Sequence, residues 1–375
     1  MIAGFATSAG TARYRDRFPE QKQAGHFRQS RHVPEASDLW LSSIGVGTYL
    51  GDPTDSADRA YTDAIATALR SGINVVDTAI NYRHQRSERN VGEALKSLIG
   101  SGELAREEVL VCTKAGYLPF DNDMPADAVS YMRKEYVDRG LAPAAEIVGG
   151  SHCMNPTYLA DQIERSRRNT GLETLDVFYL HNPETQLGYV PPDMFYTRLR
   201  SAFEMLEGLI AKGRIRYYGA ATWNGFRANP SDRSYLSLER MVATAKQVAG
   251  DKHHFRFVQL PFNLGMLEAY AYGNQARDGE AASVLAQAQD FGVAVVASGT
   301  LSQGNLADGL SPQLRSVFSA ESDAEAAIQF VRSATNLTTA LVGMGQKHHA
   351  EANAAIGKKP LFPRAEWESL FTAKN

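Results

Sequence analysis

The sequence predicts an α/β fold in which eight β–α units close into a single (β/α)8 barrel, the TIM-barrel architecture. Short β-branched runs alternate with amphipathic helical segments, and eight such units follow one another along the 375 residues. Strict alternation of this kind favours parallel strands with right-handed crossovers. An open doubly wound sheet is the rival, but it usually carries a Gly-rich turn after its first strand. Here Gly45-Val46-Gly47 is followed by Thr48-Tyr49-Leu50, so that turn is absent.

The predicted strands are short runs rich in Val, Ile and aromatic residues. In chain order they are Ser43–Thr48, Ile73–Asp77, Val109–Lys114, Asp176–His181, Arg214–Ala221, Phe255–Leu260, Val293–Ala297 and Thr339–Gly343.

Apolar residues at helical spacing predict the helices between and after the strands. Ser87 is expected to be an N-cap, and Ser71-Gly72 and Lys212-Gly213 are expected to end helices. The predicted helices are Ala57–Leu69, Ser87–Ile99, Pro156–Asn169, Pro192–Ala211, Leu238–Val248, Ala281–Asp290, Ala324–Ala334, Lys347–Ile356 and Arg364–Phe371.

Two segments lie outside this alternation. The Arg-rich start, residues 1–35, is expected to be an exposed extension or hairpin ahead of the barrel domain of residues 36–375. A long irregular insertion, about residues 117–156, follows the third strand, and loops of that length are usually functional or disordered. Its aromatic residues beside Lys114 favour a substrate lid over an inert insertion; they are Tyr117, Phe120, Tyr131 and Tyr136.

The amino-acid composition limits the classes of function and the partners that can be expected. Apolar residues make up 43% and charged residues 22%, as in ordinary globular proteins. A net charge of −3 gives no reason to expect nucleic acid or a membrane surface as partner. Two cysteines cannot build a disulfide framework, so we expect a reduced, cytoplasmic protein. His152 and Cys153 have no predicted companion ligands, so no metal site is expected. A monomer is favoured, although the oligomeric state is left open.

Four polar side chains follow three consecutive predicted strands. Asp77 ends the second strand, Tyr82 lies in the loop after it, Lys114 ends the third and His181 ends the fourth. In a barrel these positions meet at the active-site face. A buried Lys114 needs a counter-charge, which Asp77 can provide, and its cation is expected to lower the pKa of Tyr82. Together the four residues form a general acid for an oxygen that becomes an alkoxide.

These segments resemble the aldo-keto reductases over Ser42 to Asn353. The resemblance rests on Asn74-Val75-Val76-Asp77-Thr78-Ala79-Ile80-Asn81-Tyr82, on Ser87-Glu88-Arg89-Asn90-Val91-Gly92-Glu93-Ala94-Leu95, on Val111-Cys112-Thr113-Lys114 and on Asp176-Val177-Phe178-Tyr179-Leu180-His181-Asn182-Pro183. It implies a (β/α)8 barrel, a small-molecule carbonyl or alcohol substrate and NADPH as cofactor, with NADH possible. By the same resemblance Asp77, Tyr82, Lys114 and His181 are the catalytic tetrad.

The resemblance also implies a cofactor path, with departures. Thr222 stands where the family often has Asn, Gln259 matches its amide-holding glutamine, and Ser298 replaces its nicotinamide-stacking aromatic residue. Trp223 or Phe262 could compensate, or either could be core. Gln346 takes the place of the usual cation for the 2′-phosphate, which predicts a weaker NADPH preference. The full implied set is Gly47, Thr48, Asp77, Thr222, Gln259, Ser298, Leu301, Gly343, Gly345, Gln346, Lys347 and Asn353.

Other interpretations stay open at this point. Arg83 and His84, after Tyr82, either reach the pocket and favour an anionic or polyhydroxylated substrate, or lie on the solvated surface. The leading hypothesis is an NADPH-dependent carbonyl reductase. A cofactor-binding regulatory subunit with little turnover is the first alternative. A non-redox barrel enzyme that uses Lys114 for a Schiff base is the second.

Overall fold

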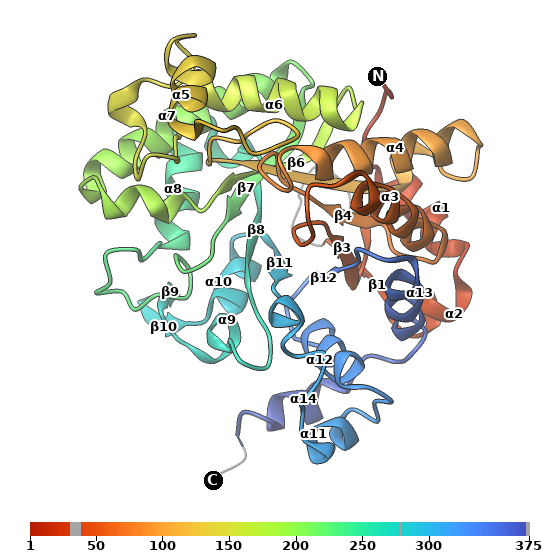
Figure 1. Cartoon of the computed structure of the whole chain (residues 1–375). Coiled ribbons are helices and arrows are strands. Elements are labelled where there is room, and N and C mark those ends of the chain that lie inside the picture. The colour runs from red at the N-terminus through yellow and green to blue at the C-terminus, as the bar shows by residue number, and fades with distance from the viewer. Residues whose placement is uncertain (31–38, 278, 373–375) are drawn as a thin grey trace.

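A closed barrel of parallel strands forms the centre of the chain (Figure 1). The computed structural model describes residues 1–30, 39–277 and 279–372. Strand β12 pairs with β3 and closes the sheet, so the predicted (β/α)8 barrel is confirmed and the open sheet is wrong. In order around the barrel the strands are β3 (Ile44–Gly47), β4 (Val75–Asp77), β5 (Leu110–Ala115), β6 (Leu175–His181), β7 (Ile215–Ala221), β8 (Phe255–Pro261), β11 (Ala294–Ser298) and β12 (Thr339–Gly343).

Helices cover the outside of the barrel. Their apolar faces pack on the strands, and local signals set their ends: Asn155 caps α6, whereas Gly171 ends it with φ 68°. The helices that follow barrel strands or close the chain are α3 (Asp55–Arg70), α4 (Arg86–Gly100), α6 (Pro156–Thr170), α7 (Pro192–Ala211), α8 (Leu238–Ala249), α10 (Val284–Asp290), α12 (Asp323–Arg332), α13 (Lys347–Ile356) and α14 (Arg364–Ser369).

The N-cap predicted at Ser87 and the helix start predicted at Ala281 are wrong. Ser87 lies inside α4, where its Oγ donates to the Thr48 carbonyl at 2.8 Å instead of capping the helix. The helix expected from Ala281 begins at Val284, because the preceding residues form a hairpin, β9 (Gln275–Arg277) with β10 (Glu280–Ala282).

The N-terminal segment packs against the barrel, so the part that is described is not an exposed tail. It contains α1 (Ser8–Asp16), α2 (Pro19–Gln23) and a hairpin of β1 (Phe27–Gln29) with β2 (Trp40–Ser42). Tyr14 is buried, and its hydroxyl donates to the Leu69 carbonyl at 2.6 Å. The predicted domain boundary between residues 35 and 36 lies outside the described residues.

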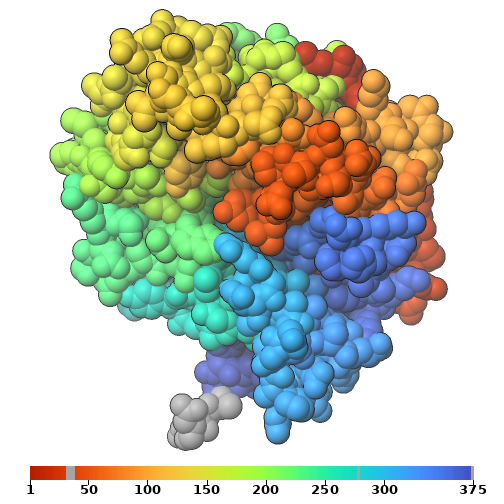
Figure 2. All heavy atoms as spheres, viewed as in Figure 1, coloured from red at the N-terminus to blue at the C-terminus, as the bar shows by residue number. Residues whose placement is uncertain are grey.

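The insertion after β5 contains regular structure: α5 (Ala128–Met132), a π-helical turn (Arg133–Val137) and a 3-10 turn (Ala144–Glu146). Figure 2 shows its yellow surface beside the orange segment near residue 50 and the green segment near residue 220. These segments all follow the carboxyl ends of strands. The short helices α9 (Glu268–Ala271) and α11 (Pro312–Val317) complete the α-helices of the described residues. Within the described residues no helix combines the length and apolar character needed to cross a membrane.

Candidate active site

The four predicted catalytic side chains meet at the carboxyl end of the barrel. Lys114 Nζ donates to Asp77 Oδ1 at 2.5 Å and to the Tyr82 hydroxyl oxygen at 3.2 Å. A third bond runs from Nζ to the Thr78 carbonyl at 2.7 Å. The rings of Tyr82 and His181 lie edge to face with centroids 5.8 Å apart. The structure therefore brings the whole tetrad together, while the roles of its members stay predictions.

The charge state of this cluster follows from its burial. Lys114 is fully buried and Asp77 is 3% exposed. Burial disfavours the ammonium, but Asp77 and Tyr82 outweigh that effect and raise the pKa of Lys114. An ammonium only donates, so the phenol oxygen accepts from it and the phenol hydrogen is left for another acceptor.

The expected lowering of the Tyr82 pKa is wrong. Burial raises the pKa of Tyr82 above its ordinary value, although Lys114 opposes the rise. Removal from water raises the pKa because a phenolate loses more hydration than a phenol. The Lys114 cation makes this rise smaller. Tyr82 is consequently a protonated phenol at neutral pH.

His181 is an uncharged imidazole. Burial, with the charge of Lys114 as the second cause, holds the pKa of His181 well below its usual range. Its Nδ1 is buried and has no hydrogen-bond partner among the described residues. A neutral ring carries one proton, and placing it on Nε2 leaves Nδ1 as an acceptor, which avoids a buried unpaired N–H. His181 can then donate a hydrogen bond through Nε2.

A cavity of about 570 Å³ opens on the His181 side of the site, although no member of the tetrad lines it. The Tyr117 ring, which lines it, contacts the His181 ring with centroids 5.3 Å apart. Trp223 lines it too and is 40% exposed. The remaining lining residues are polar or small: Asn182, Glu184, Thr185, Gly188, Asn224, Asp232, Arg233 and Ser234.

The other aromatic residues of the insertion do not face this cavity. Tyr136 is buried, and its hydroxyl donates to the Pro119 carbonyl at 2.5 Å. The Phe120 ring packs between Tyr131 and His84, with centroids 5.5 and 5.6 Å away. Of the four aromatic residues expected in a lid, only Tyr117 therefore lines the cavity.

The turn after Tyr82 has an unusual backbone. Arg83, His84 and Gln85 have φ values of 48°, 55° and 71°, in the left-handed region that non-glycine residues rarely adopt. Arg83 is 6% exposed and donates to Asp58 Oδ1 at 2.6 Å. It neither enters the pocket nor lies on the solvated surface, so both readings of Arg83 are wrong. Its ion pair instead holds the turn that carries Tyr82.

The expected nicotinamide contacts lie on neighbouring strand ends. Gln259 donates to Asp77 Oδ2 at 2.9 Å, and the Thr222 amide donates to the Gln259 carbonyl at 2.8 Å. Thr222 Oγ1 is buried without a partner among the described residues. A buried hydroxyl without a partner is costly, and it fits a site that receives an amide. Phe262 belongs to the core, since its ring stacks on Phe330 at 5.6 Å, which leaves Trp223 as the accessible aromatic residue.

The rest of the expected cofactor path follows the same rim. Gly343, at the end of β12, is paired in register with Gly47, and Thr48 Oγ1 donates to the Asp77 carbonyl at 3.1 Å. Gly345 and Gln346 follow at the start of α13. Ser298, with Leu301 after it, ends β11, and the Phe262 amide donates to the Ser298 carbonyl.

The predicted phosphate end of that path lies at α13. Gln346 is exposed, and Lys347 lies 3.8 Å from Glu351 in an exposed ion pair. Asn353 is buried further along the same helix. None of these positions carries a free arginine, so any 2′-phosphate contact here relies on Lys347 and on backbone N–H groups.

Glu184 is a site residue that sequence reasoning missed. Its Oε1 accepts the backbone N–H groups of Trp223, Asn224 and Gly225 at 2.8, 3.0 and 3.3 Å. It thereby ties the loop after β7, which carries Thr222, to the loop after His181. The available signal was an acidic residue soon after the strand-end histidine, but its partners lie about forty positions away and no local pattern identifies them.

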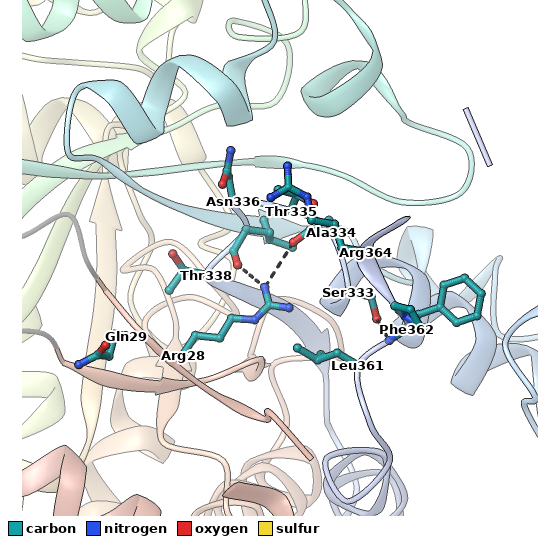
Figure 3. Close-up of a pocket in the computed structure, with 12 residues that line it drawn as sticks. Arg28, Gln29, Ser333, Ala334, Thr335, Asn336, Thr338, Leu361, Phe362 and Arg364 are labelled. Carbon is teal, nitrogen blue, oxygen red and sulfur yellow. Dashed lines mark hydrogen bonds between the residues drawn. The ribbon is translucent and has the colours of Figure 1, made fainter. Parts of the chain in front are cut away.

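Another cavity, of about 470 Å³, lies at the opposite end of the barrel, where the chain enters β12 (Figure 3). The Arg28 guanidinium points into it and donates to the carbonyls of Ala334 and Leu337. A further bond runs to the carbonyl of Arg332 at the end of α12. Arg28 thus satisfies the last carbonyl of α12 and two carbonyls of the segment between α12 and β12, and no predicted site residue lines this cavity.

The sequence is similar to a protein-family model and to several curated proteins. Residues 43–372 match the family model described as "Aldo/keto reductase family". The NADH-specific methylglyoxal reductase of Escherichia coli (strain K12) is 30% identical over 190 residues, 49% of each chain. Aldo-keto reductase AMT2 of Alternaria alternata is 27% identical over 211 residues, 51% of this chain and 49% of that protein. The chain thus spans about half the length of the curated relatives it matches.

Solved structures agree on the fold over a longer range. An aldo/keto reductase from Klebsiella pneumoniae, crystallised with NADP and acetate, superposes with a TM-score of 0.61 at 20% identity. The superposition covers 93% of this chain and 97% of that one. The aldo-keto reductase AKR11C1 from Bacillus halodurans gives a TM-score of 0.60 at 19% identity, over 92% and 95% of the two chains.

Replacing Lys114 with Met is expected to destabilise the fold by about 3–5 kcal/mol, because Asp77 is then left as an unpaired buried carboxylate. Chemical denaturation measures the free energy of unfolding. The double variant Lys114→Met with Asp77→Leu removes both charges and is expected to recover much of that loss. Equal losses in the single and the double variant would show that the ion pair is not the cause.

Proposed function

The chain belongs to the aldo/keto reductase family, and we propose that it is an NADPH-dependent carbonyl reductase that interconverts aldehydes or ketones and alcohols. The observation that carries the proposal is the contact of Lys114 Nζ with both Asp77 and the Tyr82 hydroxyl, beside an uncharged His181. The cavity beside these residues offers a place for a small carbonyl compound.

Each member of the tetrad has a separate task in this proposal. His181 donates through Nε2 to the substrate carbonyl oxygen and orients it. Tyr82 delivers its proton to the same oxygen as negative charge develops there. Lys114 stabilises the phenolate that Tyr82 becomes, and Asp77 keeps Lys114 charged and directed at the phenol. The polar residues are already in place before the reaction, so little reorganisation is needed.

The residues present fit a nicotinamide cofactor. When bound, it supplies the hydride for the carbonyl carbon. Thr222 and Gln259 would hold the amide, Trp223 offers the accessible aromatic surface, and Gly343 to Lys347 would receive the phosphates at the start of α13. The unpaired buried hydroxyl of Thr222 is the observation that supports this assignment.

Tyr82→Phe tests the function directly, because it removes the hydroxyl and keeps the ring that packs between Tyr49 and His181. Single-turnover reduction of a carbonyl panel is expected to slow by roughly 100-fold or more. Binding of NADPH should be unchanged, which serves as the control. Near wild-type rates would refute the tetrad assignment. Tight cofactor binding without turnover in the wild type would favour a regulatory subunit. Absence of cofactor binding would favour a non-redox enzyme.

The pH dependence of reduction follows from the shifted pKa values. Tyr82 acts as an acid only while protonated, and its pKa is raised from a value ordinarily near 10. His181 donates as a neutral ring, and its pKa is well below its usual range. The single-turnover rate of reduction is therefore expected to stay flat from about pH 6 to about pH 9. A decline between pH 7 and 9 would mean that the Tyr82 pKa is lowered instead.

NADPH is expected to bind more tightly than NADH, but by a smaller margin than an arginine at position 346 would give. The Glu351 carboxylate lies near Lys347 and offsets part of the positive charge that Lys347 would offer to the 2′-phosphate. Quenching of the tryptophan fluorescence, to which Trp223 contributes, can follow the titration of both cofactors. Gln346→Arg should tighten NADPH by about 10-fold, the value of one charged hydrogen bond, and leave NADH unchanged. Equal or tighter binding of NADH by the wild type would overturn the preference.

A further inference from the structure

The insertion after β5 reaches the catalytic histidine from its backbone side. His152 lies near the end of the insertion and is fully buried. Its Nε2 lies 2.8 Å from the carbonyl oxygen of His181, and its Nδ1 lies 2.9 Å from Gln186 Nε2. None of the motifs that carry the family resemblance includes His152, and the proposed mechanism of the tetrad gives it no role.

The hydrogen-bond chain fixes the tautomer of His152. Arg198 is a donor only, and it donates to Gln186 Oε1 at 2.5 Å. The Gln186 amide nitrogen must therefore face His152, where it donates to Nδ1. His152 then carries its proton on Nε2 and donates it to the His181 carbonyl. Burial lowers the pKa of His152 to about 4, which is consistent with a neutral ring of one tautomer.

The contact between His152 and the His181 carbonyl requires a glycine at position 116. Strand β5 ends at Ala115, opposite Leu180, so the position opposite His181 falls to Gly116. A Cβ on Gly116 would lie 2.5 Å from the His181 carbonyl oxygen and 2.7 Å from His152 Nε2. The glycine is what allows the histidine of the insertion to approach the carbonyl.

The ring of Tyr117 adds a second contact on the same side. It meets the His152 ring at 5.0 Å and the His181 ring at 5.3 Å, nearly perpendicular to both. The Asn182 amide nitrogen donates to the Tyr117 hydroxyl at 3.1 Å. The insertion therefore contacts the catalytic imidazole through Tyr117 and its backbone through His152.

We propose that His152 is a positioning residue for His181: its Nε2–H fixes the carbonyl at the end of β6 and so sets the direction from which the His181 imidazole meets the substrate. This inference deepens the proposed function and rests on it. The insertion would then act on the rate of the chemical step through His181, in addition to shaping the cavity with Tyr117.

A matched pair of variants tests this role. In His152→Gln the amide nitrogen can take the place of Nε2 and reach the His181 carbonyl. In His152→Asn the shorter side chain cannot reach it. We expect kcat of the Gln variant to stay within about 3-fold of wild type and that of the Asn variant to fall about 10-fold, because small misplacements of a catalytic group are costly. KM and NADPH affinity should change little in both.

A double-variant cycle separates positioning from general damage. Once His181→Ala has removed the imidazole, adding His152→Asn should cost no further activity, since coupled residues are not additive. A wild-type kcat in His152→Asn, or the same loss in the His181→Ala background, would overturn the proposal. If His152→Asn fails to fold, Gly116→Ala replaces it, because its methyl group displaces the same two atoms, and the same loss of kcat is expected.

A readout independent of turnover keeps this inference separate from the proposed function. In histidine-labelled protein, ¹⁵N NMR should show His152 as the Nε2–H tautomer, and the His181 resonances should move in His152→Asn but not in His152→Gln. Unchanged His181 resonances in the Asn variant would refute the positioning role. An inactive wild type would refute the reductase proposal alone, because the NMR result still decides the contact.

Discussion

The ion pair of Lys114 and Asp77 is the constraint on which the rest of the site depends. Two charges removed from water need nearly complete compensation, since a buried charge without partners costs several kcal/mol. Lys114 obtains it from three oxygen atoms, and one of them is the Tyr82 hydroxyl. Gln259 satisfies the second oxygen of Asp77. One of the contacts that make the buried lysine tolerable is therefore also the contact that places its ammonium on the Tyr82 hydroxyl.

The closed barrel supplies this geometry through its register. Gly47 lies opposite Asp77, so β3 and β4 end level, and Asp77 lies opposite Cys112, so β5 runs further, to Ala115. The carboxyl ends of parallel strands all lie at the same rim of the barrel. The loops that follow them there are not part of the regular hydrogen-bond ladder of the barrel strands. Polar residues at strand ends can thus converge without entering the apolar barrel interior, which is filled by residues such as Tyr179 and Phe257.

The sequence was sufficient to predict the barrel and the meeting of Asp77, Tyr82, Lys114 and His181 at its carboxyl end, because both depend on local patterns. Strand β12 and helices α7 and α13 begin and end at the predicted residues, since apolar periodicity and nearby Gly or Pro mark them. Features that depend on partners distant in the sequence were not predicted correctly. Ser87 resembles an N-cap until Thr48 is seen to accept its hydroxyl. The direction of the Tyr82 pKa shift could not be predicted, because burial and the nearby cation oppose each other and only the structure shows which is larger.

The two halves of the tetrad are held by different forces. Asp77 and Lys114 attract each other by charge, which acts over several ångströms and tolerates small errors in position, and the Lys114 ammonium donates to the neutral Tyr82 hydroxyl. His181 is uncharged and its Nδ1 has no partner among the described residues, so charge cannot orient it in the same way. Neutral hydrogen bonds and ring contacts are directional and short-ranged. The imidazole therefore depends on what packs around it: Tyr82 and Tyr117 contact its ring, and His152 contacts its backbone carbonyl.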